Sequence, residues 1–106
     1  MADGVRLVST LYNTGEVRVA EFLIEPIATG SVHYHTNVNE LVICLEGRML
    51  VHMKERASVS LLPGQRTTMP AGVVHTVENP LTEPCKYMVV QGPGKYDLVR
   101  LPANLA

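Results

Sequence analysis

Residues 29–44 read TGSVHYHTNVNELVIC. His33 and His35 stand two residues apart, a spacing that places both imidazoles on the same face of a β-strand. Glu40 follows at the start of an apolar run that is typical of a further strand. Far downstream, His75 lies inside another β-branched stretch. If these four side chains converge, they form a metal site of three nitrogen ligands and one carboxylate.

Short runs that are β-branched, or that alternate between apolar and polar residues, recur along the chain, and helical periodicity is almost absent. Glycines and prolines separate them, as in Pro63-Gly64 and Asn79-Pro80. Strands at a spacing of about 8–12 residues predict an all-β sandwich or barrel. The expected strands are 5–8, 17–24, 31–35, 40–45, 49–53, 58–62, 67–69, 73–78, 87–90 and 97–101.

No linker or internal repeat divides the sequence, so we expect one domain over residues 1–106. Its last segment, 102–106, is expected to be a strand extension or a mobile end. Formal net charge is −1, with nine basic and ten acidic residues. That balance gives no sign of a nucleic acid or membrane partner. Without a long apolar run or a signal-peptide pattern, we expect a cytoplasmic location.

The two cysteines, Cys44 and Cys85, lie far apart and form no C-x-x-C motif. We expect two reduced, buried thiols, with an interstrand disulfide as the alternative. In the run that follows Glu40, Leu41 and Ile43 lie on the face opposite to the carboxylate and are apolar too. A strand that is apolar on both faces is buried on both. A second subunit would supply the covering layer, so we predict a homodimer.

Two spaced motifs bring the candidate ligands together. The first is H-x-H-x4-E-x6-G, formed by His33, His35, Glu40 and Gly47. The second is G-x5-P-x-G-x2-H-x3-N over residues 64–79, with His75 as its histidine. In this order and spacing they resemble the two signature motifs of the cupin superfamily. The resemblance covers nearly the whole chain, and the second motif matches at all five fixed positions.

One position departs from that pattern. The first motif of the family usually opens with a glycine six residues before its first histidine, and Ile27 stands there in this sequence. Gly30 is nearer to the histidines and is a candidate for the turn instead. The departure concerns the loop that leads into the motif. All four ligand positions hold the expected residue types.

The resemblance implies a double-stranded β-helix, or jelly-roll barrel, that binds one divalent metal ion inside one end. By position, its ligands would be His33, His35, Glu40 and His75. Such ligands accept Fe, Mn, Ni, Zn, Co or Cu, so the identity of the metal stays open. Four protein ligands on an ion that prefers six leave room for a chelating, anionic small molecule. The alternative is a metal-free site whose histidines form hydrogen bonds in the core.

Two classes of function fit this site. The first is a metal-dependent enzyme of dioxygenase, isomerase or lyase type, acting on a small anionic or enolisable chelating metabolite. The alternative is a non-catalytic cupin that binds or senses a sugar or carboxylate; a storage role fits a short single domain least. No acid or base stands in phase with the ligands, so no residue is assigned to catalysis or to an organic cofactor.

Other polar side chains are expected outside the site. His52 matches no motif position and has the opposite phase to its apolar neighbours, so we expect it at the surface or in an interface. Arg48 and Arg66 are expected in solvated strand positions, with a substrate carboxylate as the alternative partner. Arg18 is expected on an exposed, charged edge. The residues that fit the pocket mouth and the core equally well are Phe22, Tyr87 and Met88.

Overall fold

The computed structural model describes residues 3–102, which form eleven β-strands and no helix. The strands are β1 (Val5–Asn13), β2 (Arg18–Ile24), β3 (Ala28–Thr29), β4 (Val32–Tyr34), β5 (Glu40–Glu46), β6 (Met49–Met53), β7 (Val59–Leu61), β8 (Arg66–Met69), β9 (His75–Asn79), β10 (Cys85–Gln91) and β11 (Val99–Leu101). Within these residues, no helix is long and apolar enough to cross a membrane. The first two and last four residues of the expected domain, and so most of segment 102–106, lie outside the described residues.

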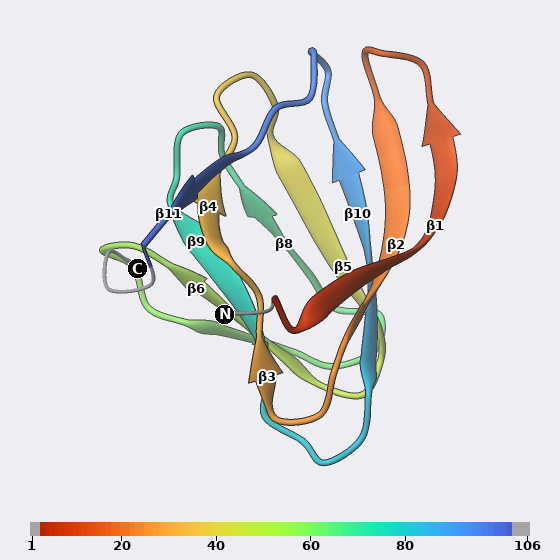
Figure 1. Cartoon of the computed structure of the whole chain (residues 1–106), viewed down its shortest axis with the longest axis vertical. Coiled ribbons are helices and arrows are strands. Elements are labelled where there is room, and N and C mark those ends of the chain that lie inside the picture. The colour runs from red at the N-terminus through yellow and green to blue at the C-terminus, as the bar shows by residue number, and fades with distance from the viewer. Residues whose placement is uncertain (1–2, 103–106) are drawn as a thin grey trace.

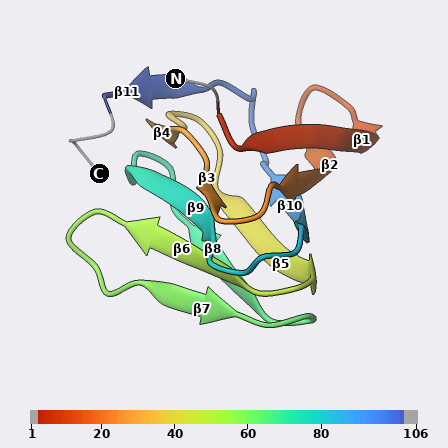
Figure 2. The same ribbon diagram turned by 60° about the horizontal axis from the view of Figure 1, so that its bottom comes forward.

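The strands form two antiparallel sheets that face each other (Figure 1). One sheet has the order β1-β2-β10-β5-β8, and the other has the order β11-β4-β9-β6-β7, with β3 paired to β9. Figure 2 shows the second sheet as a wall that runs from β11 to β7, beside β1, β2, β10 and β5. From β7 onward, successive strands alternate between the two sheets, as in a jelly roll. The predicted all-β jelly-roll barrel is therefore confirmed.

Every expected strand overlaps one in the structure, and the differences have local causes. The two-residue β3 is too short to produce a periodic pattern in the sequence. The first strand continues to Asn13, well beyond the expected end at Val8. Its pairing with β2 shifts register between Leu7 and Ser9 and again between Thr10 and Tyr12. Such shifts break the alternation by which a strand is recognised.

The core lies between the sheets and is filled by alternate residues of the central strands. In β5 and β10, buried and half-buried positions alternate along most of the strand, as the period of two requires. Fully buried apolar side chains include Ile24, Val42, Met49, Val51, Met69 and Val89. Both cysteines are buried and free, as expected. Burial raises the pKa of Cys44, and burial together with Cys44 raises the pKa of Cys85 to about 12.

Two motif positions have clear conformational roles. Ile27 has a φ of 48°, in the left-handed region that glycine tolerates best, and it stands where the family pattern has glycine. Asn79, fully buried, donates hydrogen bonds through Nδ2 to the carbonyl oxygens of Ile24 and Glu83 at 3.2 and 2.7 Å. Its Oδ1 accepts from the backbone N–H of Leu81 at 2.9 Å, the local bond expected at a strand end.

Candidate metal centre

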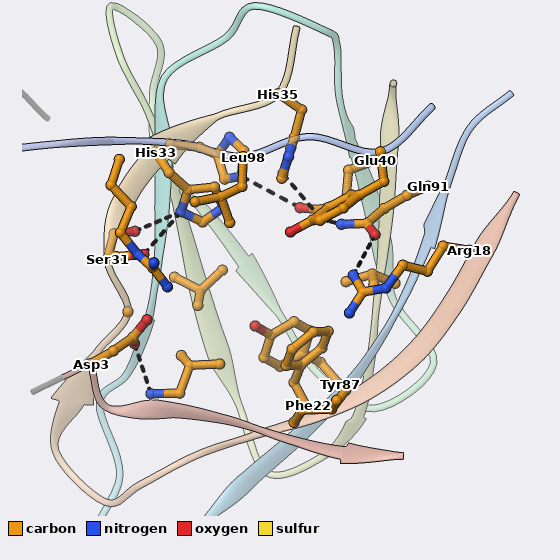
Figure 3. Close-up of a pocket in the computed structure, with 18 residues that line it drawn as sticks. Asp3, Arg18, Phe22, Ser31, His33, His35, Glu40, Tyr87, Gln91 and Leu98 are labelled. Atoms are coloured by element: carbon orange, nitrogen blue, oxygen red, sulfur yellow. Dashed lines mark hydrogen bonds and ion pairs between the residues drawn. The ribbon is translucent and has the colours of Figure 1, made fainter. Parts of the chain in front are cut away.

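Two rows of side chains, one on each sheet, line the same cavity of about 260 Å³ (Figure 3). In one sheet, Arg18 of β2 is the register partner of Gln91 on β10, and Gln91 is the partner of Glu40 on β5. In the other sheet, His33 of β4 is the partner of His75 on β9. Directly opposed residues in an antiparallel pair point to the same face. Each row therefore presents its side chains to the interior together.

Three imidazoles gather at one end of this cavity. One ring nitrogen from each of His33, His35 and His75 lies within 4.8 Å of the other two. His35 follows the end of β4, and its ring centre lies 5.0 Å from that of His33 and 5.3 Å from that of His75. His35 and His75 are 3 % and 2 % exposed, whereas His33 is half-buried. The convergence of the three predicted histidines requires both motifs.

All three rings are held in the same tautomer, because each Nδ1 lies against a backbone carbonyl oxygen. The acceptors are Ser31 O at 2.9 Å from His33, Asp97 O at 2.6 Å from His35 and Val73 O at 2.9 Å from His75. A carbonyl can only accept, so each Nδ1 carries the proton and each Nε2 keeps a lone pair. The Nε2 atoms of His35 and His75 are buried and have no hydrogen-bond partner among residues 3–102.

The carboxylate of Glu40 lies beside two of the three imidazoles. Its Oε1 is 3.5 Å from Nε2 of His35, and its Oε2 is 3.4 Å from Nε2 of His75, separations too long for good hydrogen bonds. Gln91 donates a hydrogen bond to Oε1 from its amide nitrogen. Glu40 is only 6 % exposed. Burial raises its pKa, but His35 and His75 outweigh burial and hold the pKa far below its usual value, so the carboxylate is ionised.

The protonation of the histidines also depends on their neighbours. Burial, assisted by the nearby His75, lowers the pKa of His33 to about 4, so this ring is neutral near pH 7. Burial lowers the pKa of His35 too, but the Glu40 carboxylate and the carbonyl of Asp97 outweigh it and raise this pKa above 6.5. Because Nδ1 of His35 already donates to Asp97, the proton that Glu40 favours in the metal-free protein sits on Nε2, the atom whose lone pair a metal ion would take instead.

These observations fit a divalent cation at the centre of the cluster. Buried polar atoms are nearly always satisfied, and the Nε2 lone pairs of His35 and His75 are not. They lie beside an ionised carboxylate, and no side-chain donor competes for them. Imidazole and carboxylate are ligands that Mn, Fe, Co, Ni, Cu and Zn accept. The three-histidine cluster is thus compatible with a metal ion, and it leaves the identity of that ion open.

The cavity wall contains residues that the sequence did not indicate. Arg18 was expected on an exposed edge, but it is half-buried and lines the cavity. Its NH1 donates a hydrogen bond to Oε1 of Gln91 at 2.8 Å, and its guanidinium lies 4.6 Å from the centre of the Tyr96 ring and 5.8 Å from that of Phe22. Counting in twos from the buried Ala20 would have placed Arg18 on the inner face. Tyr96 comes from a loop, where no periodic pattern exists.

Phe22 and Tyr87 line the cavity as well, and their rings stack with centres 5.5 Å apart. Figure 3 shows the hydroxyl of Tyr87 directed into the cavity. Burial and the charge of Glu40 raise the pKa of Tyr87 well above its usual value. Burial also raises the pKa of Tyr96, despite the nearby Arg18 guanidinium. Both phenols are therefore hydrogen-bond donors near neutral pH.

The other side chains considered in the sequence lie away from this cavity. His52 is half-buried on β6 and pairs with Oε1 of Glu78 at 2.8 Å, so its expected position outside the site is confirmed. Arg66 is exposed, Arg48 is bonded to Ser60, and neither lines the cavity. Met88 has the opposite phase to Tyr87 and does not line it either.

The fold and the histidine cluster together define a small β-barrel with a candidate metal centre. The cupin domain family model matches residues 20–91, and the chain belongs to this family. No curated protein matches the sequence.

Solved structures share the fold at low sequence identity. An uncharacterised Klebsiella pneumoniae protein with a double-stranded β-helix domain has a TM-score of 0.79 at 20 % identity, covering 91 % of this chain and 84 % of its own. A sugar phosphate isomerase of the cupin superfamily from Silicibacter pomeroyi has a TM-score of 0.74 at 20 % identity, covering 95 % and 82 %. Oxalate oxidase in complex with glycolate has a TM-score of 0.81 at 18 % identity, covering 93 % of this chain and 56 % of its own.

Proposed function

We propose that this protein is a metal-dependent enzyme whose single divalent ion is held by His33, His35, Glu40 and His75. Its substrate is a small anionic or enolisable metabolite that chelates the ion. One observation carries the proposal: two buried Nε2 lone pairs without hydrogen-bond partners lie 3.4 and 3.5 Å from an ionised, buried carboxylate. A polar group buried without a partner costs about 1–3 kcal/mol, and a cation shared by all these groups removes that cost.

The residues of the chain have three roles in this proposal. The Nε2 atoms and the Glu40 carboxylate hold the ion, and the backbone carbonyls that accept from each Nδ1 fix the orientation of the rings. A bound divalent ion supplies Lewis acidity for isomerase or lyase chemistry, and Fe or Mn also supplies redox chemistry of dioxygenase type. The stacked rings of Phe22 and Tyr87 exclude water from one wall, and the Tyr87 hydroxyl donates to the bound molecule.

The class of substrate follows from charge and volume. Three neutral imidazoles and one carboxylate leave a divalent site with a charge near +1, which attracts an anion. The cavity volume of about 260 Å³ lies slightly below the ~300–1,000 Å³ of drug-sized ligand sites, which indicates a small metabolite. Oxalate oxidase, which shares this fold, has been solved in complex with glycolate, a small hydroxy acid. That likeness supports a ligand of this class.

A second function has an observation of its own. Besides the four proposed ligands, the titratable side chains that line the cavity within residues 3–102 are two arginines, two tyrosines and Asp3. Neither tyrosine loses its proton near neutral pH, because both pKa values are raised. Beyond the ligands, the described wall holds no histidine or lysine for proton transfer, and its one other carboxylate, Asp3, accepts a hydrogen bond from the backbone N–H of Val5. This composition favours a cupin that binds or senses a small acid without converting it.

Two measurements separate these functions. Protein purified without chelators is analysed for metal, then loaded with Mn, Fe, Co, Ni or Zn and incubated with a panel of hydroxy and keto acids. An enzyme of the proposed kind exchanges the α-proton of a substrate in D₂O or consumes oxygen, and a binding protein shows only saturable binding. Failure of every ion to reach one per chain would contradict the ligand set.

A further inference from the structure

Arg18 occupies a fixed position in the cavity wall. Its guanidinium lies over the Tyr96 ring at 4.6 Å and near the Phe22 ring at 5.8 Å, and NH1 donates to Oε1 of Gln91 at 2.8 Å. Stacking and a hydrogen bond together restrict the rotamers of a long side chain. The same amide of Gln91 donates from its nitrogen to Glu40, so its orientation is set at both ends. Arg18 is thus preorganised beside the proposed metal site (Figure 3).

In the part of the chain that the structure describes, no carboxylate pairs with the charge of Arg18. Within residues 3–102, no carboxylate oxygen lies within 4 Å of its guanidinium nitrogens. Gln91, a neutral residue, is its only hydrogen-bond acceptor there. A guanidinium has five N–H donors, so most of those of Arg18 have no acceptor among the described residues and are free to bind a ligand in the cavity that Arg18 lines. A half-buried cation of this kind is normally paired, because desolvation of an unpaired charge is unfavourable.

We propose that Arg18 binds a second anionic group of the ligand, a carboxylate, separate from the group that chelates the metal. The inference rests on the proposed function and narrows its substrate class to small dicarboxylic acids with a chelating end. Arg18 and Glu40 stand two strands apart, roughly 10 Å between backbones, so the two ends of one small molecule reach both. The planar fork of a guanidinium fits a carboxylate and a phosphate alike, but its single positive charge balances a carboxylate and leaves a doubly charged phosphate partly unbalanced.

Arg100 is the other arginine of the cavity and the register partner of His33. It is exposed, and within the described residues it has no ion pair or side-chain hydrogen bond that would hold it in place. A side chain that is free to move loses more entropy on binding than one already fixed. The contacts of Arg18 therefore favour it over Arg100 as the residue that selects the ligand.

The test uses cobalt-loaded protein and two matched pairs of acids, with binding followed by the visible spectrum of Co(II) and by calorimetry. The pairs are malate with 2-hydroxybutanoate and 2-hydroxyglutarate with 2-hydroxypentanoate, in which a distal carboxylate is replaced by methyl. Wild type is expected to prefer at least one diacid roughly 10- to 100-fold, as a charge-assisted hydrogen bond predicts. Arg18→Gln is expected to lose that preference. Because Arg18 also bonds to Gln91, the cobalt affinity of this variant is measured separately, and the preference is taken from the ratio of the two acids of each pair on cobalt-loaded protein. Arg18→Lys should restore part of the preference.

Control variants assign the effect to one residue. Arg48→Gln removes the same charge outside the cavity and should keep the preference. Equal affinity of wild type for both members of each pair, or a preference that survives in Arg18→Gln and disappears in Arg100→Gln, would overturn the inference. Tighter binding of 3-phosphoglycerate than of either diacid would overturn the choice of a carboxylate.

Failure of the metal site gives a distinct result. If wild type binds no cobalt, the proposed function fails, and Arg18 is then tested in the metal-free protein with succinate and butanoate. Binding is followed there by the NMR shift of the Arg18 Nε–H. Succinate is expected to bind more tightly than butanoate to wild type and equally weakly to Arg18→Gln. No difference between the two acids in wild type would overturn the role of Arg18 as well.

Discussion

His33 on β4 is the direct antiparallel partner of His75 on β9, and their ring centres lie 4.4 Å apart. One residue comes from each of the two sequence motifs, so the pairing of β4 with β9 joins the motifs in space. Each ring donates from Nδ1 to a carbonyl oxygen two residues before it, Ser31 for His33 and Val73 for His75. In both motifs, the same local hydrogen bond from Nδ1 to the carbonyl two residues earlier leaves the Nε2 lone pair facing the cavity.

Replacement of His75 by alanine is expected to abolish stoichiometric metal binding and to leave a folded β protein. The variant loses one of three imidazoles and leaves His35 as the one imidazole beside the Glu40 carboxylate. Metal analysis and circular dichroism measure the two properties. His52→Ala is the control, because His52 lies outside the cavity and should keep the metal. Full metal content in His75→Ala would show that the ligand set is wrong.

Gln91→Leu is expected to weaken metal binding roughly 10- to 100-fold, the usual effect of removing a partner that orients a ligand. Gln91 donates to Oε1 of Glu40, and leucine has a similar size without the donor. Competition with a metal-binding dye measures the affinity. Gln65→Leu is the matched control, since the Gln65 amide accepts only from the backbone of Leu62 at an exposed site. Equal metal affinity in Gln91→Leu and wild type would show that Gln91 does not orient Glu40 for metal binding.

In the metal-free protein, stability is expected to fall as the pH drops from 6.5 toward 4. The pKa of His33 is about 4 in the folded state and near 6.5 in the unfolded chain. Between these two pH values the unfolded chain binds a proton at this ring and the folded chain does not, so a fall in pH favours unfolding. The loss is at most about 1.4 kcal/mol per pH unit. The raised pKa of His35 changes the free energy of unfolding only above pH 6.5. The lowered pKa of Glu40 changes it only below the usual value of 4.5.

Urea unfolding in the presence of a chelator at pH 6.5 and 5.0 measures this dependence. His33→Gln cannot take up the proton, so its free energy of unfolding should change less between the two pH values than that of wild type. Titrating groups outside the cluster contribute equally to both proteins and cancel in the comparison. The same change in both would mean that His33 has an ordinary pKa in the folded state.

The sequence was sufficient for the fold, because strand and turn patterns are local, and for the three-histidine cluster, because the two spaced motifs resemble those of the cupin superfamily. A period of two placed His33 and His35 on one side, and fixed spacings around Gly47 and Gly64 identified the two motifs. Which strands pair is a property of the tertiary fold, however. The proximity of Glu40 to Gln91 could not be read from residues so far apart in the chain.

Arg18 illustrates the limit of reading charge alone. The neighbouring Glu16 and Glu21 made it resemble part of a solvated edge, and the period of the strand was a better guide. Tyr96 had no such signal, because it lies in the loop between β10 and β11, and its contact with Arg18 joins residues far apart in the sequence. Loops that close a cavity carry few patterns, so much of a binding wall stays hidden at the level of sequence.

Ile27→Gly is expected to stabilise the protein by about 0.5–1 kcal/mol. A residue with a Cβ in the left-handed region costs about 1–2 kcal/mol, and the greater freedom of glycine in the unfolded chain offsets part of the gain. Ile27 is 65 % exposed, so little apolar burial is lost. Chemical denaturation compares the variant with Ile27→Ala, which keeps the Cβ and should show no such gain. Equal stabilities of the glycine and alanine variants would exclude strain at this position.

The predicted homodimer now has a candidate surface. The edge strand β1 exposes four large side chains, Leu7, Val8, Leu11 and Tyr12. A long apolar edge strand tends to pair with another chain unless it is covered. Leu41 and Ile43, on which the prediction rested, are half-buried on the outward face of β5.

Light scattering coupled to gel filtration at micromolar concentration is expected to give the mass of a dimer. Leu11→Lys should shift the protein toward the monomer, because it places a charge on the apolar surface of β1 at the edge of the sheet. Leu62→Lys is the matched control, since Leu62 is equally exposed but follows β7. A dimer that survives Leu11→Lys and dissociates in Ile43→Lys would place the interface on the outward face of β5 instead. A wild-type monomer at these concentrations would contradict both surfaces, because neither would then contribute enough apolar burial to hold two chains together.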